Sequence, residues 1–138
     1  MPDRGDDYFA HFDAWLRQLL AEQAAGQHHF HVLVDDVGEV LGRVNLIDVA
    51  NGSAELGFRI AEKVTGQGVA TATVREVCAL ARDTYELTSL HASAAVDNVG
   101  SRTVLDRNGF APTGETVRLA GQPGLRYTLL LADLAPNR

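Results

Sequence analysis

The chain has 138 residues, and 12 lysines and arginines stand against 18 aspartates and glutamates, so its formal net charge is −6. That length suits one domain, and we expect a single domain over residues 1–138. An acidic balance argues against nucleic acid as the main partner, because neutralising phosphates needs a basic surface, and it disfavours anionic membranes. The sequence has neither an apolar run of membrane-spanning length nor a secretory leader, so we expect a cytoplasmic protein.

The first predicted element is an amphipathic helix over residues 7–25, where aromatic and leucine side chains recur every three to four positions. A turn with Asn51 and Gly52 joins two of the strands that follow. These strands are expected at residues 28–34, 39–49 and 53–60. Short turns between consecutive strands predict an antiparallel meander.

The second half of the chain alternates helices and strands. A helix is predicted from the glycines at 66–68 to Asp83, and a short helix over residues 99–107, capped by Asn98 or Asp97. The remaining strands are expected at residues 87–96, 113–119 and 125–132, the last two joined across Gly121–Gly124. This order predicts an α/β domain with one strand–helix–strand crossover.

The most informative segment is residues 54–71, AELGFRIAEKVTGQGVAT, where a strand enters a turn with two glycines and a helix begins. Unpaired N–H groups and the macrodipole attract anions to a helix start, and Gly66 and Gly68 carry no Cβ that would block a diphosphate. The segment predicts a phosphate cradle built from backbone, or alternatively only a permissive loop. A P-loop is disfavoured because no lysine follows a glycine, and a dinucleotide fingerprint because Thr71 replaces its third glycine or alanine.

Cysteine and histidine residues give no sign of a metal site. Cys78 is the one cysteine, which excludes an internal disulfide and a cysteine zinc cluster, and we expect it to be a buried helix residue. Among the histidines, strand alternation puts His29 and His31 on one face and His28 on the other. No carboxylate or cysteine completes a set with ligand spacing, so we predict a surface strand here and no metal.

Two segments resemble the GCN5-related N-acetyltransferase (GNAT) superfamily. Residues 65–70, TGQGVA, are similar to its central Q/R-x-x-G-x-G/A loop, with Thr65 in place of the first Gln or Arg. Residues 98–110, NVGSRTVLDRNGF, resemble the N-x-x-S-x-x-V-L-E-K-x-G-F block of the branch that acetylates ribosomal-protein N-termini and related amines. The resemblance implies a mixed, mostly antiparallel sheet with a splayed parallel pair and flanking helices. We expect this fold to be shortened at its N-terminus relative to the family.

The resemblance also implies that acetyl-CoA is the cosubstrate. Main-chain groups of the strand through Phe58 and Ile60 are expected to hold the pantetheine arm, and Asn98 to contact its cysteamine end beside Ser101. The amides expected to hold the diphosphate belong to Gly66, Gln67, Gly68, Val69, Ala70 and Thr71.

The chemistry of amine acetylation needs a base for the ammonium and a hydrogen-bond donor for the leaving thiolate. Glu55 resembles the glutamate near this strand position in the branch, and we predict it as the base; a solvated strand carboxylate is the alternative. Many family members have a tyrosine acid where Leu105 stands here, so Ser101 is the predicted donor, with helix capping as its alternative role.

The resemblance implies an N-acetyltransferase that acts directly on a primary amine, either a small molecule or a protein N-terminus. A non-catalytic acyl-CoA-binding sensor or interaction module is the alternative, favoured by Thr65 and by the missing tyrosine. Family members usually have a strand and a helix before the aromatic helix, and we expect these to be missing here or supplied otherwise. An uncovered edge strand invites pairing, so we predict a homodimer.

Overall fold

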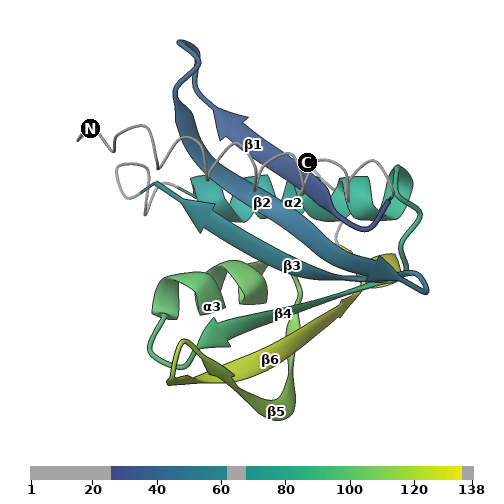
Figure 1. Ribbon diagram of the computed structural model, residues 1–138, viewed down its shortest axis with the longest axis vertical. Coiled ribbons are helices and arrows are strands. Elements are labelled where there is room, and N and C mark those ends of the chain that lie inside the picture. Colours follow the sequence, from purple (N-terminus) through teal and green to yellow (C-terminus); the bar gives the residue numbers. More distant parts are fainter. Residues whose placement is uncertain (1–25, 62–67, 135–138) are drawn as a thin grey trace, which may run out of the picture.

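The computed structural model describes residues 26–61 and 68–134. The helix predicted over residues 7–25 lies outside these ranges, and so do Gly66 and Gln67. In chain order the described elements are β1 (His29–Val34), β2 (Val40–Ala50), β3 (Ser53–Ile60), α2 (Val69–Asp83), β4 (Ser89–Ala95), α3 (Val99–Arg107), β5 (Ala111–Leu119), β6 (Gln122–Leu130) and the short 3₁₀ helix η2 (Leu131–Asp133) (Figure 1).

The strands form one sheet in the order β1-β2-β3-β4-β6-β5, and every neighbouring pair is antiparallel except β3 with β4. The predicted mixed, mostly antiparallel sheet is therefore confirmed. The parallel pairing begins at Ser53 and Ser89 and ends at Leu56 and Ala92. Both strands continue beyond that point without pairing to each other, β3 to Ile60 and β4 to Ala95. The two strands therefore splay apart, as expected.

One face of the sheet carries the hydrophobic core. The register places Leu46, Leu56, Ala92 and Tyr127 side by side in a row across four strands, and all four are buried. Helices α2 and α3 both pack on this face, because their buried residues join the same core cluster: Val74, Val77, Cys78, Ala81, Val104 and Leu105. Polar side chains such as Arg43, Glu55 and Ser93 occupy alternate positions on the opposite face.

Turn chemistry explains the first connections of the meander. The Asp35 carboxylate accepts hydrogen bonds from the backbone N–H groups of Val37 and Glu39, at 3.0 and 2.9 Å, which is the turn role expected of aspartate. Asn51 and Gly52 both have positive φ angles, 55° and 78°, as a two-residue hairpin turn requires.

The last hairpin differs from its prediction. Its turn consists of Ala120 and Gly121, with φ angles of 50° and 80°, and not of Gly121–Gly124. Gln122 pairs with Leu119 as the first residue of β6. Proline and glycine are typical of turns, but a strand near its end tolerates Pro123, whose carbonyl accepts from Val96 N–H at 3.0 Å.

Cys78 is fully buried in α2, as predicted, and burial raises its pKa to about 12. Its thiol is therefore inert at neutral pH. Within the described ranges, neither helix has the length and apolar character needed to cross a bilayer.

Candidate active site

A pocket of about 650 Å³ opens where β3 departs from β4. Its walls come from the end of β3, the first turn of α2 and helix α3. The lining residues are Phe58, Arg59, Ile60, Gly68, Ala70, Thr71, Asn98, Gly100, Ser101, Thr103, Val104 and Arg107. The volume lies within the range of small-molecule and cofactor sites.

The first turn of α2 presents unpaired backbone donors to this pocket. Gly68 is the N-cap residue, with a left-handed φ of 75°, and no side chain caps the helix. The first helical hydrogen bond runs from Ala72 N–H to the Gly68 carbonyl, at 3.1 Å. The amides of residues 69–71 precede it and have no partner inside the helix, so this end of α2 can bind an anion.

Helix α3 faces the pocket with its own N-terminus. Asn98 is the N-cap, and its side-chain oxygen accepts a hydrogen bond of 3.1 Å from the backbone N–H of Ser101. The capping function proposed for Asn98 or Asp97 therefore belongs to Asn98, and Ser101 is the residue that is capped. Ser101 lines the pocket, and its hydroxyl has no hydrogen bond to any residue in ranges 26–61 and 68–134.

Asn108 joins the two helices that form the pocket walls. Its side-chain nitrogen donates to the Thr71 carbonyl at 3.2 Å and to the Val104 carbonyl at 3.0 Å. The residue is 3% exposed, and its side-chain oxygen has no hydrogen-bond partner among the described residues. The closing turn of α3 is thus held against the first turn of α2.

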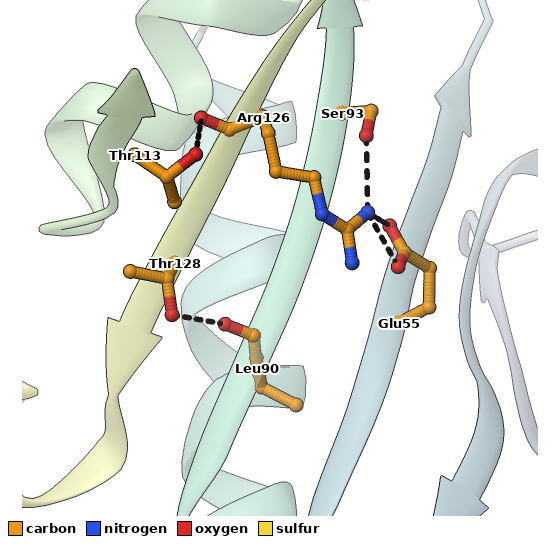
Figure 2. Close-up of polar contacts among 6 residues, drawn as sticks. All are labelled: Glu55, Leu90, Ser93, Thr113, Arg126 and Thr128. Atoms are coloured by element: carbon orange, nitrogen blue, oxygen red, sulfur yellow. Dashed lines mark hydrogen bonds and ion pairs between the residues drawn. The ribbon is translucent and has the colours of Figure 1, made fainter. Parts of the chain in front are cut away.

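Glu55 lies on the opposite face of the sheet, in an ion pair that crosses three strands (Figure 2). The Nη1 atom of Arg126 on β6 donates a hydrogen bond of 2.8 Å to Glu55 Oε2 and lies 2.7 Å from Oε1 in an ion pair. The same nitrogen lies 3.2 Å from the Ser93 hydroxyl on the intervening strand β4. Both charged side chains are about one quarter exposed, at 28% for Glu55 and 27% for Arg126.

The pocket and Glu55 are related through the splay of the sheet. Glu55 precedes Leu56, whose pairing with Ala92 is the last between β3 and β4. Beyond this pair, β3 still pairs with β2, and the backbone groups of β3 that point away from β2 have no ladder partner among the strands that the structure describes. This unpaired backbone edge separates the pocket on the helix side from Glu55 on the other side.

The structure brings most of the predicted site residues together. Phe58, Ile60, Gly68, Ala70, Thr71, Asn98 and Ser101 all line the pocket. Val69 does not line it, and Glu55 lies across the sheet from it. Gly66 and Gln67 are outside the described residues.

Sequence reasoning assigned no role in the site to four residues of this region: Arg59, Arg107, Asn108 and Arg126. Arg107 lies within the segment that resembles the family block, so its place in the pocket lining could have been anticipated. Arg126 is separated from Glu55 by 71 positions, and only the register of β6 against β4 reveals their contact.

The histidines of β1 contact Tyr85, which follows α2. The His29 ring stacks on the Tyr85 ring with centroids 3.7 Å apart, and the His31 Nε2 atom lies 2.7 Å from the tyrosine hydroxyl. Since His31 Nδ1 lies 3.0 Å from the Val44 carbonyl, which can only accept, Nδ1 carries a hydrogen and donates it to that carbonyl. Both histidines lie on one face of the sheet, as predicted, and this is the face on which α2 packs.

Comparison with solved structures identifies proteins of the same fold. A ribosomal-protein-S5-alanine acetyltransferase from Vibrio fischeri has a TM-score of 0.83 at 18% identity, covering 99% of this chain and 80% of that one. RimJ from Mycobacterium smegmatis, in complex with CoA-disulfide, has a TM-score of 0.82 at 23% identity, covering 99% and 71%. A spermidine N-acetyltransferase from Vibrio cholerae, with CoA and spermine, has a TM-score of 0.77 at 21% identity, covering 88% and 76%.

Sequence comparison gives a family. The "Putative ribosomal N-acetyltransferase YdaF" of Bacillus subtilis (strain 168) is 36% identical over 80 residues, which is 56% of this chain. The match spans 44% of the length of that relative. The family model of the acetyltransferase (GNAT) domain matches residues 4–111. The chain therefore belongs to the GNAT acetyltransferase family.

Proposed function

We propose that this protein transfers an acetyl group from acetyl-CoA to a primary amine. The observation that carries the proposal is the pocket in which the uncapped first turn of α2, the free edge of β3 and the Ser101 hydroxyl converge. Membership of the GNAT family supports it. Two of the structures with this fold contain CoA or CoA-disulfide.

The residues of the pocket fit the chemical groups of acetyl-CoA. The unpaired amides at the start of α2 suit a diphosphate, and Gly68 adds no side chain in front of them. The unpaired backbone edge of β3 near Phe58 and Ile60 suits the amides of a pantetheine arm. Asn98 and Ser101 line the same pocket and can contact the thiol end. Gly66 and Gln67 belong to the proposal as the residues that precede this helix start.

When bound, acetyl-CoA supplies an acetyl thioester as the group to be transferred. Glu55 accepts the proton that the substrate ammonium loses, directly or through a water molecule, and the free amine becomes a nucleophile. The new N–C bond replaces the C–S bond, and the proton that the nitrogen loses as the amide forms passes to the departing thiolate. The Ser101 hydroxyl donates a hydrogen bond to that thiolate as it leaves.

The acceptor is the amine of a small molecule or of a protein N-terminus. The similar structures include enzymes named for spermidine and for a ribosomal protein, so the fold accommodates both classes. A homodimer and a cytoplasmic location complete the proposal. Exposed Val32 and Val34 on β1, an edge strand of the described sheet, support self-association.

A non-catalytic acyl-CoA-binding module is the second candidate. Two observations favour it: Leu105 is fully buried where many family members have a tyrosine acid, and both Glu55 oxygens are occupied by Arg126. Such a module would bind acetyl-CoA through the same pocket without turnover.

Calorimetric titration with acetyl-CoA, followed by thiol release with a panel of amines, separates the two candidates. We expect binding, and CoA release that depends on an amine and is lost in Glu55→Gln. Binding without release on any amine would favour the module, and absence of binding would contradict both.

A further inference from the structure

The sheet face that carries Glu55 is positively charged, although the chain as a whole is acidic. At the paired positions of β2, β3, β4 and β6 that point away from the helices, the charged residues are Arg43, Glu55, Arg59 and Arg126. Three arginines and one glutamate therefore lie on this side of the sheet, in a protein whose formal net charge is −6. Since Arg126 already neutralises Glu55, the charge left over on this face is that of Arg43 and Arg59.

Arg43 and Arg59 are direct cross-strand neighbours in the β2–β3 register. Both are exposed, and neither forms an ion pair with another residue of the described ranges 26–61 and 68–134. Like charges in directly opposed positions destabilise a sheet, and an anion placed between them relieves that repulsion. The planar guanidinium groups suit a carboxylate, which they can bind in bidentate geometry.

A second observation points to the same place. Arg43 and Arg59 are the charged residues in the lining of a hollow of about 510 Å³ at this end of the β2–β3 hairpin. Its other lining residues are Val40, Leu41, Gly42, Ile60 and Ala61. Arg59 and Ile60 also line the larger pocket, so the hollow adjoins the proposed acetyl-CoA site.

The distance from Glu55 to this arginine pair determines how long an acceptor must be to contact both. Arg59 follows Glu55 by four positions on β3, which is about 13 Å along a strand. Between them lies Gly57, paired with Asn45. A Cβ atom added at Gly57 would meet nothing within 4 Å, so no described side chain covers the strand at this position.

We propose that the acceptor is an extended peptide N-terminus with an acidic side chain at its third or fourth residue. Its amine lies at Glu55 and its carboxylate between Arg43 and Arg59. An extended chain covers about 3.5 Å per residue, which places the third or fourth side chain within reach of two arginines about 13 Å away. Polyamines are disfavoured as acceptors, because the arginine pair would repel their second positive charge. The placement of the amine at Glu55 rests on the proposed acetyl transfer, whereas the placement of the carboxylate at the arginine pair does not.

The test uses amidated tetrapeptides with a free N-terminus that carry Asp, Asn or Lys at position three or four, with spermidine as a further acceptor. CoA release gives kcat/KM for each, and calorimetry on the CoA-bound protein gives each peptide's affinity. We expect kcat/KM to be at least about tenfold higher for Asp than for Lys peptides. Arg43→Gln and Arg59→Gln should each remove that preference, while Arg118→Gln, on β5, should keep it.

The same variants separate two sources of the anion, because a phosphate of acetyl-CoA has the same chemistry as an acceptor carboxylate. Unchanged KM for acetyl-CoA in Arg43→Gln, a variant of a residue that does not line the larger pocket, supports the acceptor. A raised KM for acetyl-CoA with unchanged peptide preference overturns the proposal, and so does equal or better use of Lys peptides or spermidine by the wild-type protein.

Failure of the proposed function gives a different result from failure of this inference. If no amine is acetylated but Asp peptides bind more tightly than Lys peptides, and Arg43→Gln and Arg59→Gln abolish the difference, the arginine pair is an acidic-peptide site in a protein without turnover. If no peptide shows an arginine-dependent affinity or rate, the inference is wrong whether or not other amines are acetylated.

Discussion

The side-chain nitrogen of Asn108 donates a hydrogen bond of 3.2 Å to the backbone carbonyl of Thr71. Two helix ends are joined by this contact: the residue that closes α3 and the first turn of α2, whose free amides face the pocket. The position of the proposed diphosphate site relative to Ser101 thus depends on one buried amide group.

Asn108→Ala should therefore reduce both stability and acetyl-CoA affinity. The substitution leaves the Thr71 and Val104 carbonyls without their side-chain donor, and we expect a loss of about 1–3 kcal/mol in unfolding free energy. Urea denaturation and calorimetric titration measure the two effects. Asp106→Ala, at an exposed position of the same helix, is the matched control. Equal behaviour of the two variants would contradict a linking role for Asn108.

Glu55→Gln should lower kcat and leave the KM for acetyl-CoA nearly unchanged, because Glu55 does not line the pocket. Loss of a general base costs about 10²- to 10⁴-fold in rate. Arg126→Gln, which keeps the carboxylate and removes its ion pair, should lower kcat less. Steady-state kinetics with both substrates varied measures the effects. A Glu55→Gln variant with wild-type kcat would assign the glutamate a structural role only.

Asn98→Ala and Ser101→Ala separate capping from catalysis at the start of α3. The cap is formed by the Asn98 side chain and the backbone of Ser101, so Asn98→Ala should cost about 1 kcal/mol of stability and Ser101→Ala almost nothing. Removal of a hydrogen-bond donor to the thiolate should reduce kcat by about 10²-fold or more in Ser101→Ala. Thermal melts and kcat measurements check both. Wild-type kcat in Ser101→Ala would exclude the serine as donor.

Protonation of His29 should make the fold less stable in mild acid. Burial, and then the neighbouring His31 and His28, lower the pKa of His29 below its ordinary value of 6.5. The unfolded chain therefore binds this proton at a higher pH than the folded protein, and stability falls as pH decreases through 6.5 toward the lowered pKa. His29→Phe, which keeps a ring against Tyr85, should show a smaller loss of Tm between about pH 7.5 and about pH 5.5. Equal losses would contradict this role.

Arg43→Gln should stabilise the sheet. The substitution removes one of two like charges that face each other across β2 and β3, and we expect a gain of about 0.2–1 kcal/mol. Urea denaturation at low ionic strength measures it, and 1 M salt should reduce the difference between variant and wild type to about zero. A destabilised variant would mean that other contacts of Arg43 outweigh the repulsion.

Local chemistry made much of the fold predictable from sequence. Helix α3 occupies the predicted residues 99–107 because Asn98 caps its start and Gly109, with φ of 87°, follows its end. Strand β3 occupies its predicted residues because the Asn51–Gly52 turn sets where it begins. The glycine-rich segment indicated the pocket because Gly68 begins a helix without a side-chain cap.

Contacts between distant strands could not be predicted in this way. The last hairpin was misplaced because Pro123 and Gly124 look like turn residues, while the pairing of Leu119 with Gln122 makes them part of a strand. The ion pair of Glu55 with Arg126 depends on the register of β4 between β3 and β6. No local sequence pattern indicates how these strands are aligned.

Cys78 has a practical consequence for enzymology. It is the one cysteine of the chain, it is fully buried, and burial raises its pKa to about 12. A chromogenic disulfide reagent, which reacts with thiolates, will therefore detect CoA released in turnover with no background from the folded protein. In the absence of acetyl-CoA, slow colour development will instead report the rate at which the protein opens and exposes Cys78, so the same reagent can follow both catalysis and inactivation.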